Sequence, residues 1–195
     1  MKKIILLAFL FLGYTAYSQD TISKPFTKEY FRLYYIIPGA VGNNVLAKAN
    51  KGTFGVGTAI TPYIFKNFHF FIGAEFSKYD ITDASLAGNI ETTWISNAYA
   101  GVLYKIPLAK NIDLNPRFSV GYFSVNQRSN GNNYGKQHGP AFSPGADIDY
   151  KLTGHFRIFA GINYALAFPE THTNKEYKSF FGTLHQVNIV TGIKF

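Results

Sequence analysis

The chain contains no cysteine and few charged residues. The absence of cysteine excludes a disulfide-stapled scaffold, a cysteine-ligated zinc or iron–sulfur site, a cysteine nucleophile and a lipid-anchored N-terminal cysteine. Only 15% of the 195 residues are charged, whereas 17% are aromatic and 18 residues are glycine. A disordered chain has the opposite balance, with low hydrophobicity and high charge. This composition, and a length that suits one domain, indicate a folded all-β chain with exposed aromatic side chains.

The chain also lacks an apolar run long enough to cross a membrane as a helix. The run Ile4–Leu12 has nine residues, whereas a spanning helix needs about 20. Two lysines precede this run, and the small residues Ala16 and Ser18 follow it, which is the layout of a secretory signal peptide. We therefore expect a signal peptide over residues 1–18, cleaved after Ser18, and a short periplasmic lead over residues 19–28.

Apolar and polar residues alternate in eight later segments. Strict alternation is typical of a β-strand with two unlike faces. In the first segment Leu33 and Ile37 share the apolar face, and Arg32 lies on the other. In the second, Ile64 is expected on the same face as Ile60. The apolar faces of the eight segments fall within residues 31–37, 54–64, 68–76, 94–106, 112–122, 142–150, 156–166 and 187–195.

Two kinds of connection alternate between these segments. Eight up-and-down strands with both ends on the short-turn side give this order, which is the layout of bacterial outer-membrane barrels with short periplasmic turns and longer outer loops. Tight turns are expected at residues 66–67, 107–111 and 153–155, and longer polar loops at residues 41–53, 80–92, 127–141 and 169–182.

The polar face of the strands is the predicted interior. A soluble barrel of the lipocalin type is apolar inside and polar outside, and the charges here favour the opposite arrangement. Aromatic residues also gather near both ends of the apolar face, as expected where rings lie at two membrane interfaces. The predicted fold is all-β, an eight-stranded antiparallel up-and-down transmembrane β-barrel over residues 29–195. Its polar face carries many glycines and the charged residues Arg32, Glu75, Arg117, Asp147, Asp149 and Arg157.

With these features the chain resembles the small outer-membrane β-barrel family of the OmpA, OmpX and OmpW type. Its alternating end, Val187 to Phe195, closes on an aromatic residue, and in that family this pattern is the signal read by the barrel-assembly machinery. The resemblance implies a monomer in the cell outer membrane, surrounded by its lipids and lipopolysaccharide. It implies either a structural or surface-interaction role through the outer loops, as in OmpX, or a narrow conduit for small or apolar solutes, as in OmpW.

The interior charges are the first candidate site. Arg117 and Asp147 fall at similar heights on neighbouring strands, and so Arg117–Asp147 and Asp149–Arg157 are predicted cross-strand pairs, with Glu75 in the same interior. An eight-stranded barrel is only just wide enough for side chains to fill it. Charges buried there must be paired or solvated, because a lone buried charge costs several kcal/mol. We therefore expect a plug of ion pairs, ahead of a conducting or catalytic role.

Motifs for catalysis, metals and nucleotides are weak. The stretch Gln127–Gly131 resembles the His-x-Ser-Asn motif of outer-membrane lipid A deacylases, but Gln127 replaces the base that would activate Ser129. The histidines do not form a zinc-binding pair on a helix, and no glycine-rich loop opens a helix to hold phosphate.

The formal charge is +8, but the excess lysines lie near the short turns, where they can meet anionic lipid headgroups. No enzyme activity, cofactor, metal or nucleic-acid partner is expected.

The third long loop is the predicted surface contact. It is rich in amide and aromatic side chains, namely Asn130, Asn132, Asn133 and Tyr134. Amides carry both hydrogen-bond donors and acceptors, and the resemblance to OmpX-type barrels places such a loop on the cell surface.

Overall fold

The computed structural model describes residues 31–130, 132–171 and 175–195. The predicted signal peptide and lead, residues 1–28, lie outside the described residues. The strands are β1 (Phe31–Val41), β2 (Asn50–Phe65), β3 (Phe68–Ile81), β4 (Thr92–Tyr104), β5 (Ile106–Ala109), β6 (Ile112–Ser129), β7 (Asn132–Thr153), β8 (Phe156–Ala167) and β9 (Leu184–Lys194). The helices are α2 (Val45–Ala49), α3 (Ala84–Ala87), the 3₁₀ turn η1 (Lys175–Tyr177) and α4 (Lys178–Gly182).

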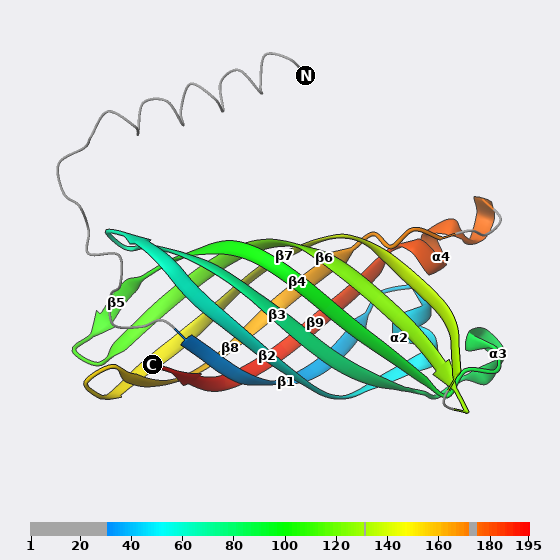
Figure 1. Ribbon diagram of the computed structural model, residues 1–195, viewed down its shortest axis with the longest axis horizontal. Helices are drawn as coiled ribbons and strands as arrows, with labels where there is room; N and C mark the ends of the chain where they lie inside the picture. Colours follow the sequence, from blue (N-terminus) through cyan, green and yellow to red (C-terminus); the bar gives the residue numbers. More distant parts are fainter. Residues whose placement is uncertain (1–30, 131, 172–174) are drawn as a thin grey trace, which may run out of the picture.

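The strands form one closed antiparallel sheet, whose strands cross the barrel at a tilt (Figure 1). Consecutive strands pair except β4 and β5, β1 pairs with β9, and β4 pairs with β6. The segment β5 follows β4 after a break at Lys105 and pairs with the first residues of β6. The nine segments therefore build eight barrel strands, which confirms the predicted fold. The β1–β9 and β4–β6 pairings close the barrel, and Phe195 exchanges two backbone hydrogen bonds with Phe31 at the end of the β1–β9 ladder.

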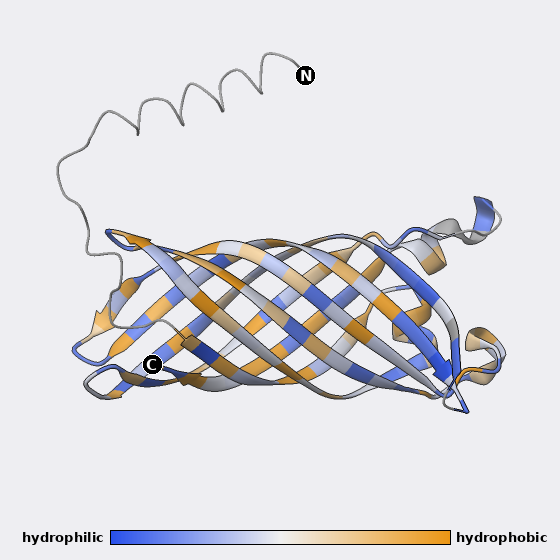
Figure 2. Ribbon diagram, viewed as in Figure 1, coloured by the Kyte–Doolittle hydropathy of each residue, from blue (hydrophilic) through white to orange (hydrophobic). Residues whose placement is uncertain are grey.

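The two faces of the strands point as the alternation predicts. Side chains on the outer face are apolar and about half exposed, including Ile37 (53%), Ile162 (52%) and Ile189 (52%). Between them, Arg32 and Asp147 point inward and are buried. Figure 2 shows the resulting alternation of orange and blue along the strands. An apolar belt on the outside and buried charges on the inside are the pattern of a barrel that is solvated by lipid.

One predicted face is wrong in the second strand. The ladder between β2 and β3 pairs Ile60 with Ile72 and then Tyr63 with Phe70, so β2 holds one extra residue in this interval. This β-bulge reverses the alternation. Tyr63 therefore points outward, 51% exposed, and Ile64 lies opposite the buried His69 instead of continuing the face of Ile60.

The long connections are more ordered than the predicted loops. The first, second and fourth contain the helices α2, α3 and α4, which lie at one end of the barrel (Figure 1). Asp83 caps α3, and the Ser85 hydroxyl and backbone N–H that donate to its carboxylate lower the pKa of Asp83. The predicted third loop, 127–141, is instead a hairpin, because β6 runs to Ser129 and β7 starts at Asn132. Within the described residues, no helix is long and apolar enough to cross a membrane.

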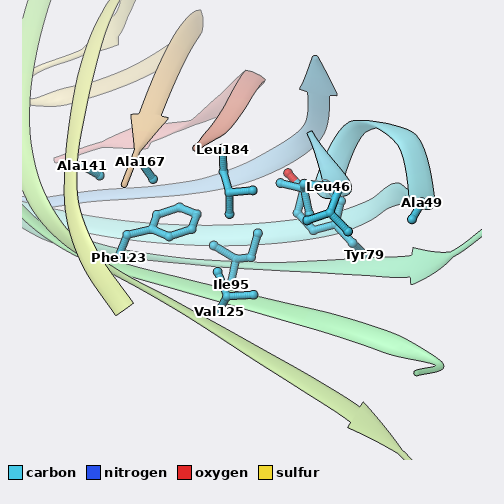
Figure 3. Close-up of a cluster of buried hydrophobic side chains, with 10 residues drawn as sticks. Leu46, Ala49, Tyr79, Ile95, Phe123, Val125, Ala141, Ala167 and Leu184 are labelled. Carbon is cyan, nitrogen blue, oxygen red and sulfur yellow. The ribbon is translucent and has the colours of Figure 1, made fainter. Parts of the chain in front are cut away.

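The helix α2 closes the interior at the long-connection end. Asn44 starts it by accepting a hydrogen bond from the Ala47 amide at 3.0 Å while donating to the Val41 carbonyl at 2.8 Å. This cap turns Leu46 and Ala49 into the barrel mouth, where they are 2% and 0% exposed. Figure 3 shows Leu46 on the side of α2 toward Ile95 and Leu184, with Ala49 at the other end of the helix. The buried apolar group comprises Val45, Leu46, Ala49, Tyr79, Ile95, Phe123, Val125, Ala141, Ala167 and Leu184.

Candidate functional site

The centre of the interior charge cluster is Asp147 on β7. Its two carboxylate oxygens contact Arg32 of β1 at 2.6 Å and Lys194 of β9 at 2.9 Å. Asn115 of β6 donates a third hydrogen bond at 2.9 Å. Asp149, two residues along β7, holds Lys194 at 2.5 Å. Two cations and two carboxylates thus form a neutral, buried network that ties strands from across the barrel together.

An aromatic ring backs both cations of this network. The Arg32 guanidinium lies 4.5 Å and the Lys194 ammonium 4.8 Å from the centroid of the buried Phe159 ring. Such cation–π contacts stabilise a charge that has lost water. A small cavity of about 10 Å³ adjoins the network, lined by Arg32, Thr61, His69, Leu103, Asn115, Asp149 and Lys194. It is close to the size of one water molecule, and Nε and Nη1 of Arg32 are buried without a hydrogen-bond partner among the described residues.

A second charged group lies beside the first. Asp113 of β6 contacts Arg157 of β8 at 2.5 Å and Lys105 at 3.2 Å. Asp113 and Arg157 are both buried, at 7% and 8% exposure. The interior near the short turns therefore holds two groups of paired charges.

The individual partners differ from the predicted ones. The structure pairs Asp147 with Arg32 and Lys194, and the Arg117 Nε donates to Asn163 at 2.8 Å. It pairs Arg157 with Asp113, and Asp149 with Lys194. The reason is geometric, because side chains in so narrow a barrel reach across the lumen as well as to the adjacent strand. The sequence did not predict Arg32 and Lys194 as partners of Asp147, because they lie on β1 and β9, which closure of the barrel brings opposite each other.

Glu75 belongs to a separate layer in the middle of the barrel. It accepts a hydrogen bond at 2.8 Å from the Tyr34 hydroxyl, which also contacts the Tyr99 hydroxyl at 2.5 Å. Glycines make room for these rings, since a Cβ at Gly57 would lie 2.3 Å from the Tyr34 ring and one at Gly73 2.4 Å from the Tyr99 hydroxyl. The sequence signal for this layer is the pair of inward tyrosines facing glycines on the next strand.

Three layers therefore fill the lumen. From the short turns outward they are the paired charges, the tyrosine–glutamate layer and the apolar group with α2. In the stretch that resembles the deacylase motif, residue 127 is glutamine, which cannot act as the base for Ser129. Ser129 itself is buried at the end of β6. Among the described residues, no group of three or more His, Asp or Glu side chains could hold a metal ion.

The predicted contact residues lie at the tip of the β6–β7 hairpin. Asn130 has a positive φ of 47°, a conformation that asparagine tolerates in tight turns. Its backbone N–H donates to Glu91 at 3.1 Å, and Asn133 accepts from the Arg128 Nε at 3.1 Å. Asn130, Asn132 and Asn133 are exposed. The side chain of Tyr134 lies outside the described part of the structure.

Comparisons with known proteins give structural matches alone. No family model and no curated protein matches the sequence. The crystal structure of Neisserial surface protein A matches 86% of this chain and 96% of its own, with a TM-score of 0.65 and 13% identity. Ail, the attachment invasion locus protein of Yersinia pestis, matches 87% of this chain and 100% of its own, with a TM-score of 0.47 and 9% identity. A major outer membrane protein from Thermus thermophilus matches 85% of this chain and 99% of its own, with a TM-score of 0.45 and 14% identity. The chain has the fold of small eight-stranded outer-membrane β-barrels.

Proposed function

We propose that this protein is a non-conducting, non-enzymatic outer-membrane barrel that contacts the cell surroundings through its outer hairpin. One observation carries the proposal, namely the filling of the lumen by side chains from the charge network around Asp147 to Leu46 of α2. A barrel of eight strands has no room beside such layers for a solute path. Its exposed ends are then the surfaces available for function.

The outer wall supports the membrane placement. A belt of half-exposed isoleucine, leucine and valine side chains suits lipid and would be costly in water. The matched fold is that of a Neisserial surface protein, and long connections of such barrels face outward. Phe195 would serve the barrel-assembly machinery, and the folded protein would be a monomer among outer-membrane lipids.

The tip of the β6–β7 hairpin suits a polar partner. The exposed amides of Asn130, Asn132 and Asn133 carry donors and acceptors that match sugar hydroxyls. The neighbouring Arg128 adds a cation. A polysaccharide of the cell surface, such as the sugar chain of lipopolysaccharide, has this chemistry.

The placement and orientation can be tested by cysteine labelling, since the chain has no native cysteine. A cysteine at the hairpin tip, Asn132→Cys, should react with a membrane-impermeant maleimide on intact cells. The matched variant Lys110→Cys, in the turn between β5 and β6, should react after the outer membrane has been permeabilised and not before. Equal labelling of both on intact cells, or the reverse order, would contradict the proposed orientation.

The proposed contact role can be tested with the polysaccharide of lipopolysaccharide, freed of its lipid, as the probe. The folded protein in phosphatidylcholine nanodiscs should bind the immobilised sugar, and the triple variant Asn130→Ala, Asn132→Ala and Asn133→Ala should bind several-fold more weakly, because each alanine removes one amide. A difference in migration between unboiled and boiled samples on a denaturing gel shows that the barrel is closed, and thus that the variant is folded.

A planar-bilayer recording separates this role from the alternative conduit. The native protein should show no steady single-channel current. A stable current that scales with salt, together with unchanged sugar binding by the triple variant, would replace the contact role with conduction.

A further inference from the structure

The lipid-facing wall carries a hollow of about 470 Å³ across β1 to β4 and β6. Its floor consists of Thr58, Ala74 and Ala98, which lie opposite one another on three adjacent strands. Leu33 flanks this row on β1 and Tyr122 flanks it on β6. These two side chains are 50% and 57% exposed, so small residues between large ones form a groove. Its lining is predominantly apolar.

A cationic and aromatic row lies directly beyond the groove, toward the long connections. Lys78, Trp94, Asn126 and Lys136 are opposite one another on β3, β4, β6 and β7. Arg128 lies two residues farther along β6. The Lys78 ammonium is 6.0 Å from the Trp94 ring centroid, and Trp94 also packs on Phe76, a groove residue, at 5.1 Å. The groove and the row therefore form one continuous surface.

We propose that this surface binds a phosphorylated glycolipid of the outer leaflet, with an acyl chain in the groove and phosphates on Lys78, Lys136 and Arg128. The inference rests on the proposed outer-membrane placement and concerns the wall, away from the hairpin tip. Aromatic rings and cations at the end of an apolar belt match the boundary between acyl chains and headgroups.

The spacing of the cations favours two phosphates over one. Lys78 and Lys136 are three strand spacings apart, which is about 14 Å at roughly 4.8 Å per spacing. To share a single phosphate, the two lysines would have to bend toward each other over Trp94 and Asn126, whereas a sugar headgroup with two separated phosphates can meet each lysine at its own strand. Asp80 pairs with Lys78 at 2.9 Å, and Glu91 accepts from Asn130. Both carboxylates lie beyond the row as seen from the groove, so a phosphate above a groove-bound chain meets the cations first.

The experiment uses Trp94, the one tryptophan of the chain, as a local reporter. The folded full chain is placed in bilayers of phosphatidylcholine with brominated acyl chains, which quench Trp94. Bisphosphorylated lipid A, free of polysaccharide, should displace the quencher and restore emission. The double variant Lys78→Gln and Lys136→Gln should bind lipid A about 30-fold more weakly, at about fivefold for each charge. Lys110→Gln, the same change at the other end of the barrel, should bind as the native protein does.

The groove is tested by filling it. Ala98→Leu should weaken lipid A binding several-fold, whereas Ala160→Leu, at another exposed wall position on β8, should leave it unchanged. The proposal is overturned if the lysine variants bind as the native protein does, if Ala98→Leu has no effect, or if phosphatidylglycerol binds as tightly as lipid A. Because the lipid carries no polysaccharide, failure here leaves the sugar-binding test of the hairpin unaffected. If Asn132→Cys and Lys110→Cys were instead labelled equally on intact cells, the proposed orientation in the membrane would be wrong, and the glycolipid site would lose its basis.

Discussion

Replacing Asp147 with leucine is expected to lower the free energy of unfolding by about 3–5 kcal/mol. Asp147 is 1% exposed and neutralises Arg32 and Lys194, both of them buried. Without it, one carboxylate, Asp149, remains beside two cations that are almost fully buried. Urea unfolding of the refolded protein in lipid measures the change.

A second substitution should recover much of this loss. Arg32→Met, combined with Asp147→Leu, leaves the neutral pair of Lys194 and Asp149, which are 2.5 Å apart. The coupling energy between the two substitutions should fall in the upper part of the usual 0.5–3 kcal/mol range for residues in contact. Replacing a whole buried pair with apolar groups of similar volume is often nearly neutral.

The matched control is the pair that the sequence predicted. Arg117→Met with Asp147→Leu should show the weaker coupling, because Arg117 donates to the neutral Asn163 at 2.8 Å. If the Arg117–Asp147 coupling energy exceeded the Arg32–Asp147 coupling energy, Asp147 would pair with Arg117 on the adjacent strand, and the network across the lumen would be wrong.

The faces of the strands could be predicted from the sequence because a strand has a fixed period of two. That period places Leu33 and Ile37 on one face and Arg32 on the other without any knowledge of the neighbouring strands. The prediction of the faces fails where a β-bulge interrupts this period. The extra residue between Ile60 and Tyr63 leaves no mark in the composition, since apolar residues continue on both sides of the bulge.

Contacts across the lumen could not be predicted in the same way. They depend on strand tilt and register around the whole barrel, which alternation in single strands does not specify. The two cations that pair with Asp147 come from β1 and β9, more than 40 residues away in sequence in each case. The inward turn of α2 is also hidden, because the apolar residues Val45, Leu46 and Ala49 sit within a stretch of turn-forming residues that predicts a loop.

Replacing Ile162 with arginine is expected to cost about 2–4 kcal/mol of unfolding free energy in a bilayer, the cost of a cation on the lipid face at the membrane middle. Ile162 lies near the centre of β8, opposite Ile189 of β9, and both side chains are 52% exposed on the outer wall. Urea titration in phosphatidylcholine vesicles measures the change, and Ile189→Arg should give a similar value because it lies beside Ile162.

The matched control is Leu152→Arg, near the short-turn end of β7, where the side chain is 47% exposed. An arginine there can reach the headgroups, so the cost should fall to about 0–1 kcal/mol. The difference between the two sites measures membrane depth, since both are exposed apolar residues that receive the same cation. If both substitutions cost equally little, the wall would be facing water, and the exposed isoleucines could no longer support a membrane barrel. If Leu152→Arg cost more than Ile162→Arg, the membrane would be centred nearer the short turns, and the row of Lys78 and Trp94 would lie outside the lipid boundary on which the glycolipid site depends.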